Sequence, residues 1–268
     1  MELHLILGYL AAILIGLILG LIGGGGSILA LPVLVYLFDI DPVTATAYSL
    51  FIVGIAALVG TLKNYGQNLV EVKTAMVFAV PALTAVYLTR RYLMPAIPDP
   101  IFSTESWAVS KAMGLMIFFA IIMVFVSISM IKDRQDNSAL PAANPQYNYP
   151  MIVLEGFLVG ILTGIVGAGG GFLIIPALVL LAKLPMKKAV ATSLLIIAIK
   201  SLIGFIGDVQ VLEIDWSFLL FFALLSIIGI FVGIRLNRVV SGKNLKKGFG
   251  WFVLLMALII VLKEVWSL

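Results

Sequence analysis

Apolar residues dominate the chain in long blocks that are separated by short polar stretches. Leu5 to Phe38 contains no Asp, Glu, Lys or Arg over 34 positions, and Pro42 to Leu62 adds a further 21. Runs of about 18 or more apolar residues are typical of helices that cross a lipid bilayer. The pattern therefore predicts an all-α protein that crosses the membrane several times.

Each half of the chain contains five such segments. Most have about 20 residues, which at about 1.5 Å per residue is enough to cross a hydrocarbon core of about 30 Å. One segment in each half reaches only about half way, so we expect one half-length helix per half. The predicted segments are 5–22, 27–38, 43–63, 71–91 and 111–132, then 151–166, 172–182, 187–207, 216–236 and 247–266.

The second half repeats the first at a spacing of 144 residues. With this shift GLIGGGGSILALP (Gly20–Pro32) aligns with GIVGAGGGFLIIP (Gly164–Pro176), and between residues 20 and 62 the two halves share 17 of 43 positions without a gap. Self-similarity at a fixed spacing indicates a duplicated unit. The predicted parts are a first membrane repeat at 1–132, a polar cytoplasmic linker at 133–150 and a second membrane repeat at 151–268.

Charges in the loops favour opposite orientations for the two repeats. The loop after the first short segment holds Asp39 and Asp41, whereas its counterpart, AKLPMKK, holds three lysines. Positive residues favour the cytoplasmic side, so equivalent loops are expected on opposite sides of the membrane, as in an inverted repeat. Three basic residues argue against an inverted repeat, because in that arrangement they would flank an external loop. They are Arg90, Arg91 and Lys111.

A glycine cluster stands directly before each short segment. Glycine readily interrupts a helix, so we expect a helix to end and a half-length or re-entrant helix to begin inside the membrane. The free amides and the dipole of a helix N-terminus attract anions. Broken helices at corresponding positions of two repeats are typical of the central site of a transporter.

The glycine clusters have two other interpretations. Small residues also let membrane helices pack closely, and the sequence leaves this alternative open. GIVGAGGG superficially fits a dinucleotide-binding fingerprint, but that motif requires a preceding strand and a βαβ unit, neither of which is predicted here.

Three polar side chains of the following segments are candidates for the same site. Ser49 and Ser193 occupy one repeat position, and each hydroxyl can either donate to an anion or bond to a carbonyl of its own helix. Lys200, whose counterpart is Ala56, is a cation within an apolar segment, two turns after Ser193. Intramembrane charges often mark functional sites, although Lys200 could instead extend toward the Asp208 end of its segment.

Composition narrows the classes of function. The chain is 62% hydrophobic and 11% charged. Its net charge of +4 comes from basic residues scattered over short loops, which fits cytoplasmic loop bias rather than nucleic-acid binding. There are no cysteines and His4 is the single histidine, so we expect no metal site, no cofactor and no enzymatic activity.

Two further sets of residues follow from the segments. Glu155 and Lys200 are the candidates for proton coupling within the predicted spans, although Glu155 could sit at an interface. Aromatic residues near segment ends are expected to anchor the protein at the membrane surface. These are Tyr36, Tyr48, Tyr87, Tyr92, Trp107, Trp216, Trp251 and Trp266.

The two glycine-proline blocks, followed by ATAYSLFIVG and AVATSLLIIAIKS, resemble the sulfite exporter TauE/SafE (TSUP) family of membrane permeases. The resemblance extends from about Leu5 to Trp266. It implies transport of small sulfur-containing anions across the cytoplasmic membrane, driven by ion gradients. By position it implicates Gly23, Gly24, Gly25, Gly26 and Ser27 in one half, and Gly167, Ala168, Gly169, Gly170 and Gly171 in the other.

We therefore expect a secondary transporter in the cytoplasmic (inner) membrane that moves a small anion such as sulfite or an organosulfonate by alternating access. The lipid bilayer and the anion are its expected partners, and a homo-oligomer is compatible with the sequence. A passive anion channel could use the same site and is the alternative. The sequence leaves open the anion, the direction of transport and the coupling ion.

Overall fold

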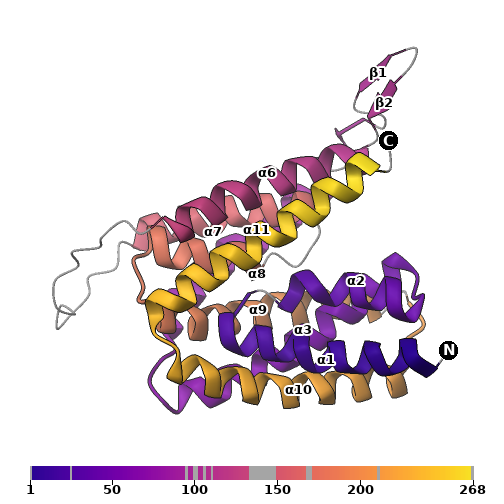
Figure 1. Ribbon diagram of the computed structural model, residues 1–268. Coiled ribbons are helices and arrows are strands. Elements are labelled where there is room, and N and C mark those ends of the chain that lie inside the picture. Colours follow the sequence, from indigo (N-terminus) through magenta and orange to yellow (C-terminus); the bar gives the residue numbers. More distant parts are fainter. Residues whose placement is uncertain are drawn as a thin grey trace.

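The computed structural model describes residues 2–24, 26–93, 96–98, 102–104, 107–109, 111–132, 149–166, 171–209 and 212–266. Most of these residues form a bundle of helices, in which one group of helices is inclined to the other (Figure 1). The elements are α1 (Glu2–Ile22), α2 (Gly26–Phe38), α3 (Pro42–Tyr65), α4 (Val72–Leu88), η1 (Thr89–Leu93), β1 (Phe102–Thr104), β2 (Trp107–Val109), α6 (Lys111–Ile131), α7 (Tyr149–Val166), α8 (Gly171–Pro176), η2 (Ala177–Leu181), α9 (Met186–Val209), α10 (Trp216–Val239) and α11 (Gly242–Trp266), where η marks a π-helix.

Each predicted apolar segment overlaps one of these helices, and the two predicted short segments are α2 and the pair formed by α8 and η2. Five of the described helices are long and apolar enough to cross a membrane. The chain is therefore an all-α, multi-pass membrane protein. An unpredicted feature is a small antiparallel hairpin of β1 and β2, which projects beyond the helices in Figure 1.

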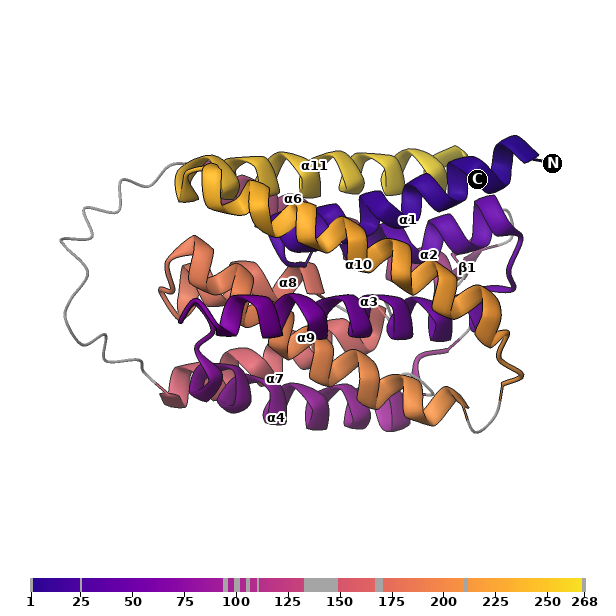
Figure 2. The same cartoon turned by 90° about the horizontal axis from the view of Figure 1, so that it is seen from below.

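The helices pack in pairs that follow the 144-residue repeat. Helix α1 lies along α10, and its counterpart α7 lies along α4, the counterpart of α10. The pair α3 with α9 joins a helix to its own counterpart, and Figure 2 shows these two helices in the middle of the bundle. The pair α6 with α11 joins the last helix of each half, which correspond in order but not at the 144-residue spacing. The core repeats too, because the equivalent residues Phe78 and Phe222 are both fully buried.

Two equivalent glycines allow close backbone contacts in these pairs. A Cβ on Gly16 of α1 would collide with the carbonyl oxygen of Ser226 in α10. A Cβ on Gly160 of α7 would lie 2.5 Å from the carbonyl oxygen of Ala82 in α4. Small residues at such points let backbones approach closely in a membrane. Close packing also involves the first cluster, because a Cβ on Gly26 would lie 2.7 Å from the carbonyl oxygen of Ile15.

The two short helices also end alike. Asp39, one residue after α2, and Lys183, two residues after η2, adopt a left-handed conformation with φ of 52° and 56°. The following amides bond back to equivalent carbonyls, Ile40 to Leu34 at 3.2 Å and Leu184 to Leu178 at 2.8 Å. A left-handed residue is a common way to end a helix. The short helices contact each other inside the bundle.

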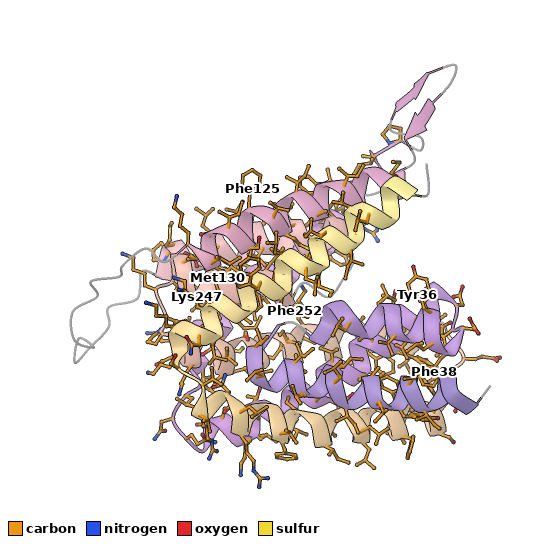
Figure 3. All side chains as sticks on the ribbon, viewed as in Figure 1. Tyr36, Phe38, Phe125, Met130, Lys247 and Phe252 are labelled. Atoms are coloured by element: carbon orange, nitrogen blue, oxygen red, sulfur yellow. The ribbon has the colours of Figure 1, made fainter. Side chains whose placement is uncertain are left out.

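Charged side chains distinguish the two ends of the bundle. Figure 3 shows Lys247 at one end and Tyr36 and Phe38 at the other. The first, which we call the basic end, is where α3, α8 with η2 and α10 end and where α4, α9 and α11 begin. The other, the acidic end, is where α2 and α9 end and α3 and α10 begin. The acidic end holds Asp39, Asp41, Asp208, Glu213 and Asp215, and the basic end holds Lys63, Lys73, Lys183, Lys187, Lys188, Arg235, Arg238, Lys243, Lys246 and Lys247.

Candidate functional site between the two halves

The first glycine cluster interrupts the helix, as the sequence predicts. Helix α1 ends at Ile22 and α2 begins at Gly26. Between them Gly23 has φ of +92°, a conformation that residues with a Cβ rarely adopt. Its amide still bonds to the carbonyl of Leu19 at 2.7 Å, so Gly23 is the point at which the chain leaves α1.

Gly23 lies against the second half of the chain. A Cβ built on it would be 2.5 Å from Ser193 Oγ, 2.9 Å from Ile175 Cδ1 and 3.3 Å from the Cα of Val190. These residues belong to α9 and α8, so the break in the first repeat faces the short helix and the following helix of the second. The structure thus brings together Gly23 and Ser193, two of the predicted site residues.

Both predicted serines donate to their own helices. Ser193, which is fully buried, donates to the carbonyl of Val190 at 2.8 Å. Ser49, which is half-buried, donates to the carbonyl of Thr46 at 2.9 Å, the equivalent bond in the first repeat. To bind either hydroxyl, an anion would have to replace the helix carbonyl as the acceptor of its hydrogen bond.

The ammonium of Lys200 is held at the end of α7. It donates to Thr163 Oγ1 at 2.7 Å, and the threonine hydroxyl donates to the carbonyl of Gly160 at 3.2 Å. Thr163 is three residues before Val166, where α7 ends and the second glycine cluster follows. The contact directs Lys200 toward the last turn of α7.

The residues of the two glycine clusters can be placed only in part. Gly171 is the first residue of α8, Gly24 lies in the bend after α1, and Gly26 begins α2. The remaining predicted residues of the clusters, Gly25, Gly167, Ala168, Gly169 and Gly170, lie outside the described residues, as does the side chain of Ser27.

A pair of equivalent hydrogen bonds joins the halves at the two ends. At the basic end the amide of Glu71 donates to Thr192 Oγ1 at 3.1 Å. At the acidic end the amide of Asp215 donates to Tyr48 Oη at 2.7 Å. Glu71 is the counterpart of Asp215, and Thr192 is the counterpart of Tyr48. We call these bonds the basic latch and the acidic latch.

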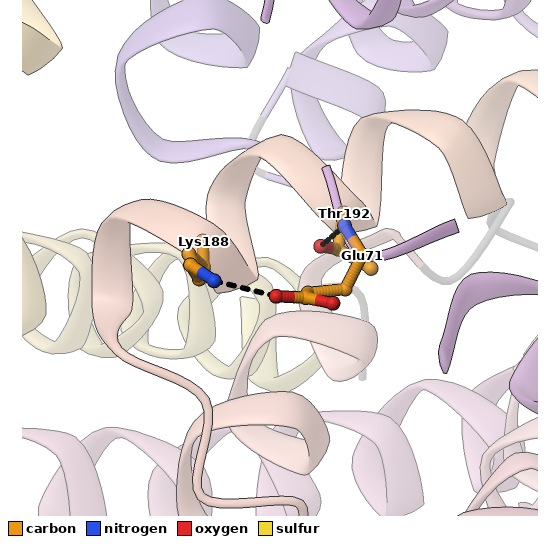
Figure 4. A network of polar contacts seen from close by, with 3 residues as sticks. All are labelled: Glu71, Lys188 and Thr192. Carbon is orange, nitrogen blue, oxygen red and sulfur yellow. Dashed lines mark hydrogen bonds and ion pairs between the residues drawn. The ribbon is translucent and has the colours of Figure 1, made fainter. Parts of the chain in front are cut away.

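The surroundings of the latches differ. Figure 4 shows that the carboxylate of Glu71 also pairs with Lys188 of α9, with Nζ to Oε1 at 2.5 Å. At the acidic end Tyr48 stacks on Phe218, with ring centroids 6.0 Å apart. The prediction that Tyr48 is a surface anchor is wrong, because only 4% of it is exposed. Its side chain fills the contact with the second half instead of facing the membrane surface.

Asn237, which was not among the predicted site residues, also contacts the other half of the chain. Its side-chain amide donates from α10 to the carbonyl of Leu21 at 2.7 Å. That carbonyl is in the last turn of α1, where a helix leaves its carbonyls without amide donors of its own. Asn237 therefore stabilises the end of α1 at the break. Asn237 lies between Arg235 and Arg238 in the polar last turn of α10, so the sequence pattern does not single it out.

Comparison with known proteins places this architecture among transporters. The family model described as sulfite exporter TauE/SafE matches residues 8–260. A "Probable membrane transporter protein" of Xylella fastidiosa (strain 9a5c) is 28% identical over 255 residues, which cover 92% of this chain and 91% of the relative. "Probable membrane transporter protein YunE" of Bacillus subtilis (strain 168) is 27% identical over 282 residues, with 96% of each chain covered.

A further "Probable membrane transporter protein", from Methanocaldococcus jannaschii, is 26% identical over 254 residues, which cover 87% of this chain and 88% of the relative. No solved structure gives a significant match. The family model spans nearly the whole chain. The protein therefore belongs to the sulfite exporter TauE/SafE family, and it is a membrane transporter that lies in the lipid bilayer and transports a small substrate.

Proposed function

We propose that the protein is a secondary transporter that moves a small sulfur-containing anion, such as sulfite or an organosulfonate, across the cytoplasmic membrane by alternating access coupled to an ion gradient. The observation that carries this proposal is the contact between Gly23 and Ser193. It sets the interrupted helix of one repeat against the helix of the other, which is where transporters with duplicated folds bind their substrates.

We infer that the two repeats, 1–132 and 151–268, are inverted with respect to each other. Support comes from the crossing of α3 and α9. A Cβ on Gly60 would be 3.1 Å from Leu194 Cδ1, and a Cβ on Gly204 would be 3.3 Å from Leu50 Cδ1. Gly60 and Gly204 are counterparts, as are Leu50 and Leu194. A late residue of each helix thus meets an early residue of the other, so the helices are antiparallel.

The charges support an orientation with the basic end in the cytoplasm, because Lys and Arg are enriched in cytoplasmic loops. Residues 133–150 follow α6 at this end, which agrees with their proposed role as a cytoplasmic linker. Arg91 is the counterexample: it lies in η1, after the end of α4, and therefore at the acidic end. Its guanidinium lies 5.9 Å from the ring of Tyr92.

The anion would be held where the halves meet. The first-turn amides of α2 have no partner within the helix, and the helix dipole adds about half a positive charge there. Ser193 supplies a hydroxyl beside Gly23, and Lys200 supplies the positive charge at the end of α7. The remaining cluster residues, with Ser27 and Ser49, complete the proposed site.

Alternating access requires that the two ends open in turn. Both latches join one repeat to the other, and both are made in this structure. We propose that the basic latch breaks when the site faces the cytoplasm and the acidic latch breaks when it faces the opposite side. A passive anion channel, the alternative, would require both ends to be open together.

The proposal is tested by uptake into proteoliposomes. Labelled sulfite, sulfate and a sulfonate are offered with and without a pH gradient, and counterflow is measured against the same unlabelled anion. We expect saturable uptake and counterflow of at least one sulfur anion. A steady current far above carrier rates without counterflow would favour the channel, and no uptake of any of the three anions would contradict the proposed substrate class.

A further inference from the structure

A carboxylate is buried in α7 without a partner among the described residues. Only 2% of Glu155 is exposed, and neither of its carboxylate oxygens has a hydrogen-bond partner in that part of the chain. Neighbouring parts of the protein therefore cover Glu155, which faces neither lipid nor bulk solvent in this structure. Burying an ionised carboxylate that is neither paired nor hydrogen-bonded is far more costly than burying the neutral acid.

We propose that Glu155 is the proton-binding site of the transporter. The inference rests on the proposed function, to which it adds the coupling ion. In the conformation seen here the carboxyl group holds the proton. When the other conformation lets water reach α7, the proton leaves for that water and the carboxylate is hydrated. A proton taken up from water on one side and released to water on the other completes the cycle.

The surroundings of Glu155 fit a proton better than a metal cation. Hard cations are held by several oxygen ligands at once. No polar atom among the described residues bonds to the Glu155 carboxylate, and those residues contain no group of three or more acidic or histidine side chains that could hold a metal. A proton needs one oxygen atom only.

Charged and titratable side chains on the neighbouring elements do not compensate Glu155. The elements packed on α7 include α4, η1, α6, α8 and η2, and α8 and η2 carry no titratable residue. Lys200 of α9 also reaches α7, where its ammonium bonds to Thr163 and not to Glu155. The side chains of Lys73, Tyr87, Arg91 and Tyr92 on α4 and η1 are exposed, and none of them bonds to Glu155. The remaining basic groups of these elements are Arg90 of η1 and Lys111 of α6.

The position of Glu155 connects it with the proposed anion site. Thr163, which holds the ammonium of Lys200, follows on the same helix after eight residues, or about 12 Å. Glu155 and Lys200 both stand where the first repeat has an alanine, at Ala11 and Ala56. A movement of α7 that hydrates Glu155 would also move Thr163, and this links loss of the proton to the anion site.

A spectroscopic test does not depend on transport. The infrared C=O band of a protonated carboxylic acid is recorded at neutral pH for the purified protein in a detergent without ester groups, because the ester carbonyls of phospholipids absorb in the same region. We expect such a band in the wild-type protein, its loss in Glu155→Gln, and its retention in Thr74→Val, which removes the other buried polar side chain that lacks a partner among the described residues. A wild-type protein without the band, or a band that persists in Glu155→Gln, would overturn the proposal.

A transport test uses the same variants with the sulfur anion that gives counterflow. A pH difference of one unit can drive about tenfold accumulation per coupled proton. We expect the wild-type protein and Thr74→Val to accumulate the anion. Glu155→Gln, and Glu155→Ala, which restores the residue of the first repeat, should retain counterflow without accumulation.

The outcomes separate this inference from the proposed function. Accumulation by Glu155→Gln at the wild-type level would refute the inference and leave the proposed function intact. Absence of wild-type counterflow would refute the function instead, and the infrared band would still decide the protonation of Glu155. A sodium gradient that drives accumulation when a pH gradient does not would overturn the inference and assign a different coupling ion.

Discussion

Gly16 of the first half lies against the carbonyl of Ser226 of the second half, and Gly160 of the second half lies against the carbonyl of Ala82 of the first. The two contacts are equivalent, because the residues of one are offset from those of the other by 144 positions. The latches repeat in the same way, with Glu71 on Thr192 and Asp215 on Tyr48. The backbone contacts of the halves are therefore shared by the two copies of the repeat.

The polar side chains of the two halves have diverged on this common scaffold. Lys200 stands where the first half has Ala56, and Glu155 stands where it has Ala11. At both positions the second half has a titratable side chain and the first half has an alanine. The difference teaches that the repeat supplies the contacts that the two halves share. In the proposed mechanism these contacts allow either end to open, and the residues found in the second half alone provide binding and coupling.

The largest effects are expected from the shared glycines. Gly16→Leu and Gly160→Leu each force a side chain into a backbone carbonyl, and overpacking of this kind costs about 3 kcal/mol or more. Both variants should lose folded protein in detergent, as measured by thermal unfolding and size-exclusion chromatography. Gly207→Ala is the control, because nothing lies within 4 Å of its Cβ. Tolerance of one leucine and not the other would show that the halves do not pack equivalently.

Lys200→Met should preserve the fold and weaken anion binding. A hydrogen bond to a charged group contributes about 1.5–3 kcal/mol, so we expect at least about a tenfold loss of affinity in a direct binding measurement. Lys243→Met removes an exposed lysine at the basic end and should bind as the wild type does. Unchanged affinity in Lys200→Met would exclude Lys200 from the site.

Smaller effects are expected from the latch hydroxyls. Tyr48→Phe and Thr192→Val each remove one hydrogen bond, worth about 1 kcal/mol. Because the chain has no cysteine, Val190→Cys can serve as a single label beside Gly23. A membrane-impermeant maleimide should react faster from the basic side in Thr192→Val and from the acidic side in Tyr48→Phe.

The control for these variants is Thr84→Val, which removes an exposed hydroxyl that bonds within its own helix. It should leave labelling unchanged from either side. Faster labelling from the same side in both latch variants would contradict the assignment of one latch to each end.

The smallest effect is expected from the ion pair at the basic latch. The Lys188 and Glu71 side chains are 34% and 28% exposed, and pairs near the surface contribute about 0–1 kcal/mol and are screened by salt. Lys188→Gln should raise labelling from the basic side slightly, and only at low ionic strength. Lys187→Gln is the control, because the neighbouring lysine Lys187 donates to the carbonyl of Arg238 and not to Glu71. An effect of Lys188→Gln that persists in high salt would contradict a screened surface contact.

The helices and the first interruption could be predicted from sequence because both depend on local composition. Apolar length predicts the spans, and four adjacent glycines before Ser27 predict the break that Gly23 makes with its positive φ. The 144-residue repeat also predicts that Ser49 and Ser193 are equivalent, and their matching bonds to Thr46 and Val190 agree.

Contacts between the halves could not be predicted in the same way. The bonds of Tyr48 and Asn237 to the other half depend on where α10 lies relative to α1 and α3, which the apolar pattern does not define. Tyr48 near the start of a helix is indistinguishable in sequence from a surface anchor. The burial of Glu155 likewise depends on the helices that surround α7.

Uptake of a sulfur anion by Gly23→Ala tests most directly whether the break in α1 forms the transport site. At φ of +92° a side chain is strained by about 1–2 kcal/mol and would also crowd Ser193 Oγ. The account predicts a folded, membrane-inserted protein whose uptake falls at least about tenfold, next to a Gly207→Ala control with wild-type uptake. Wild-type uptake by a folded Gly23→Ala would contradict it.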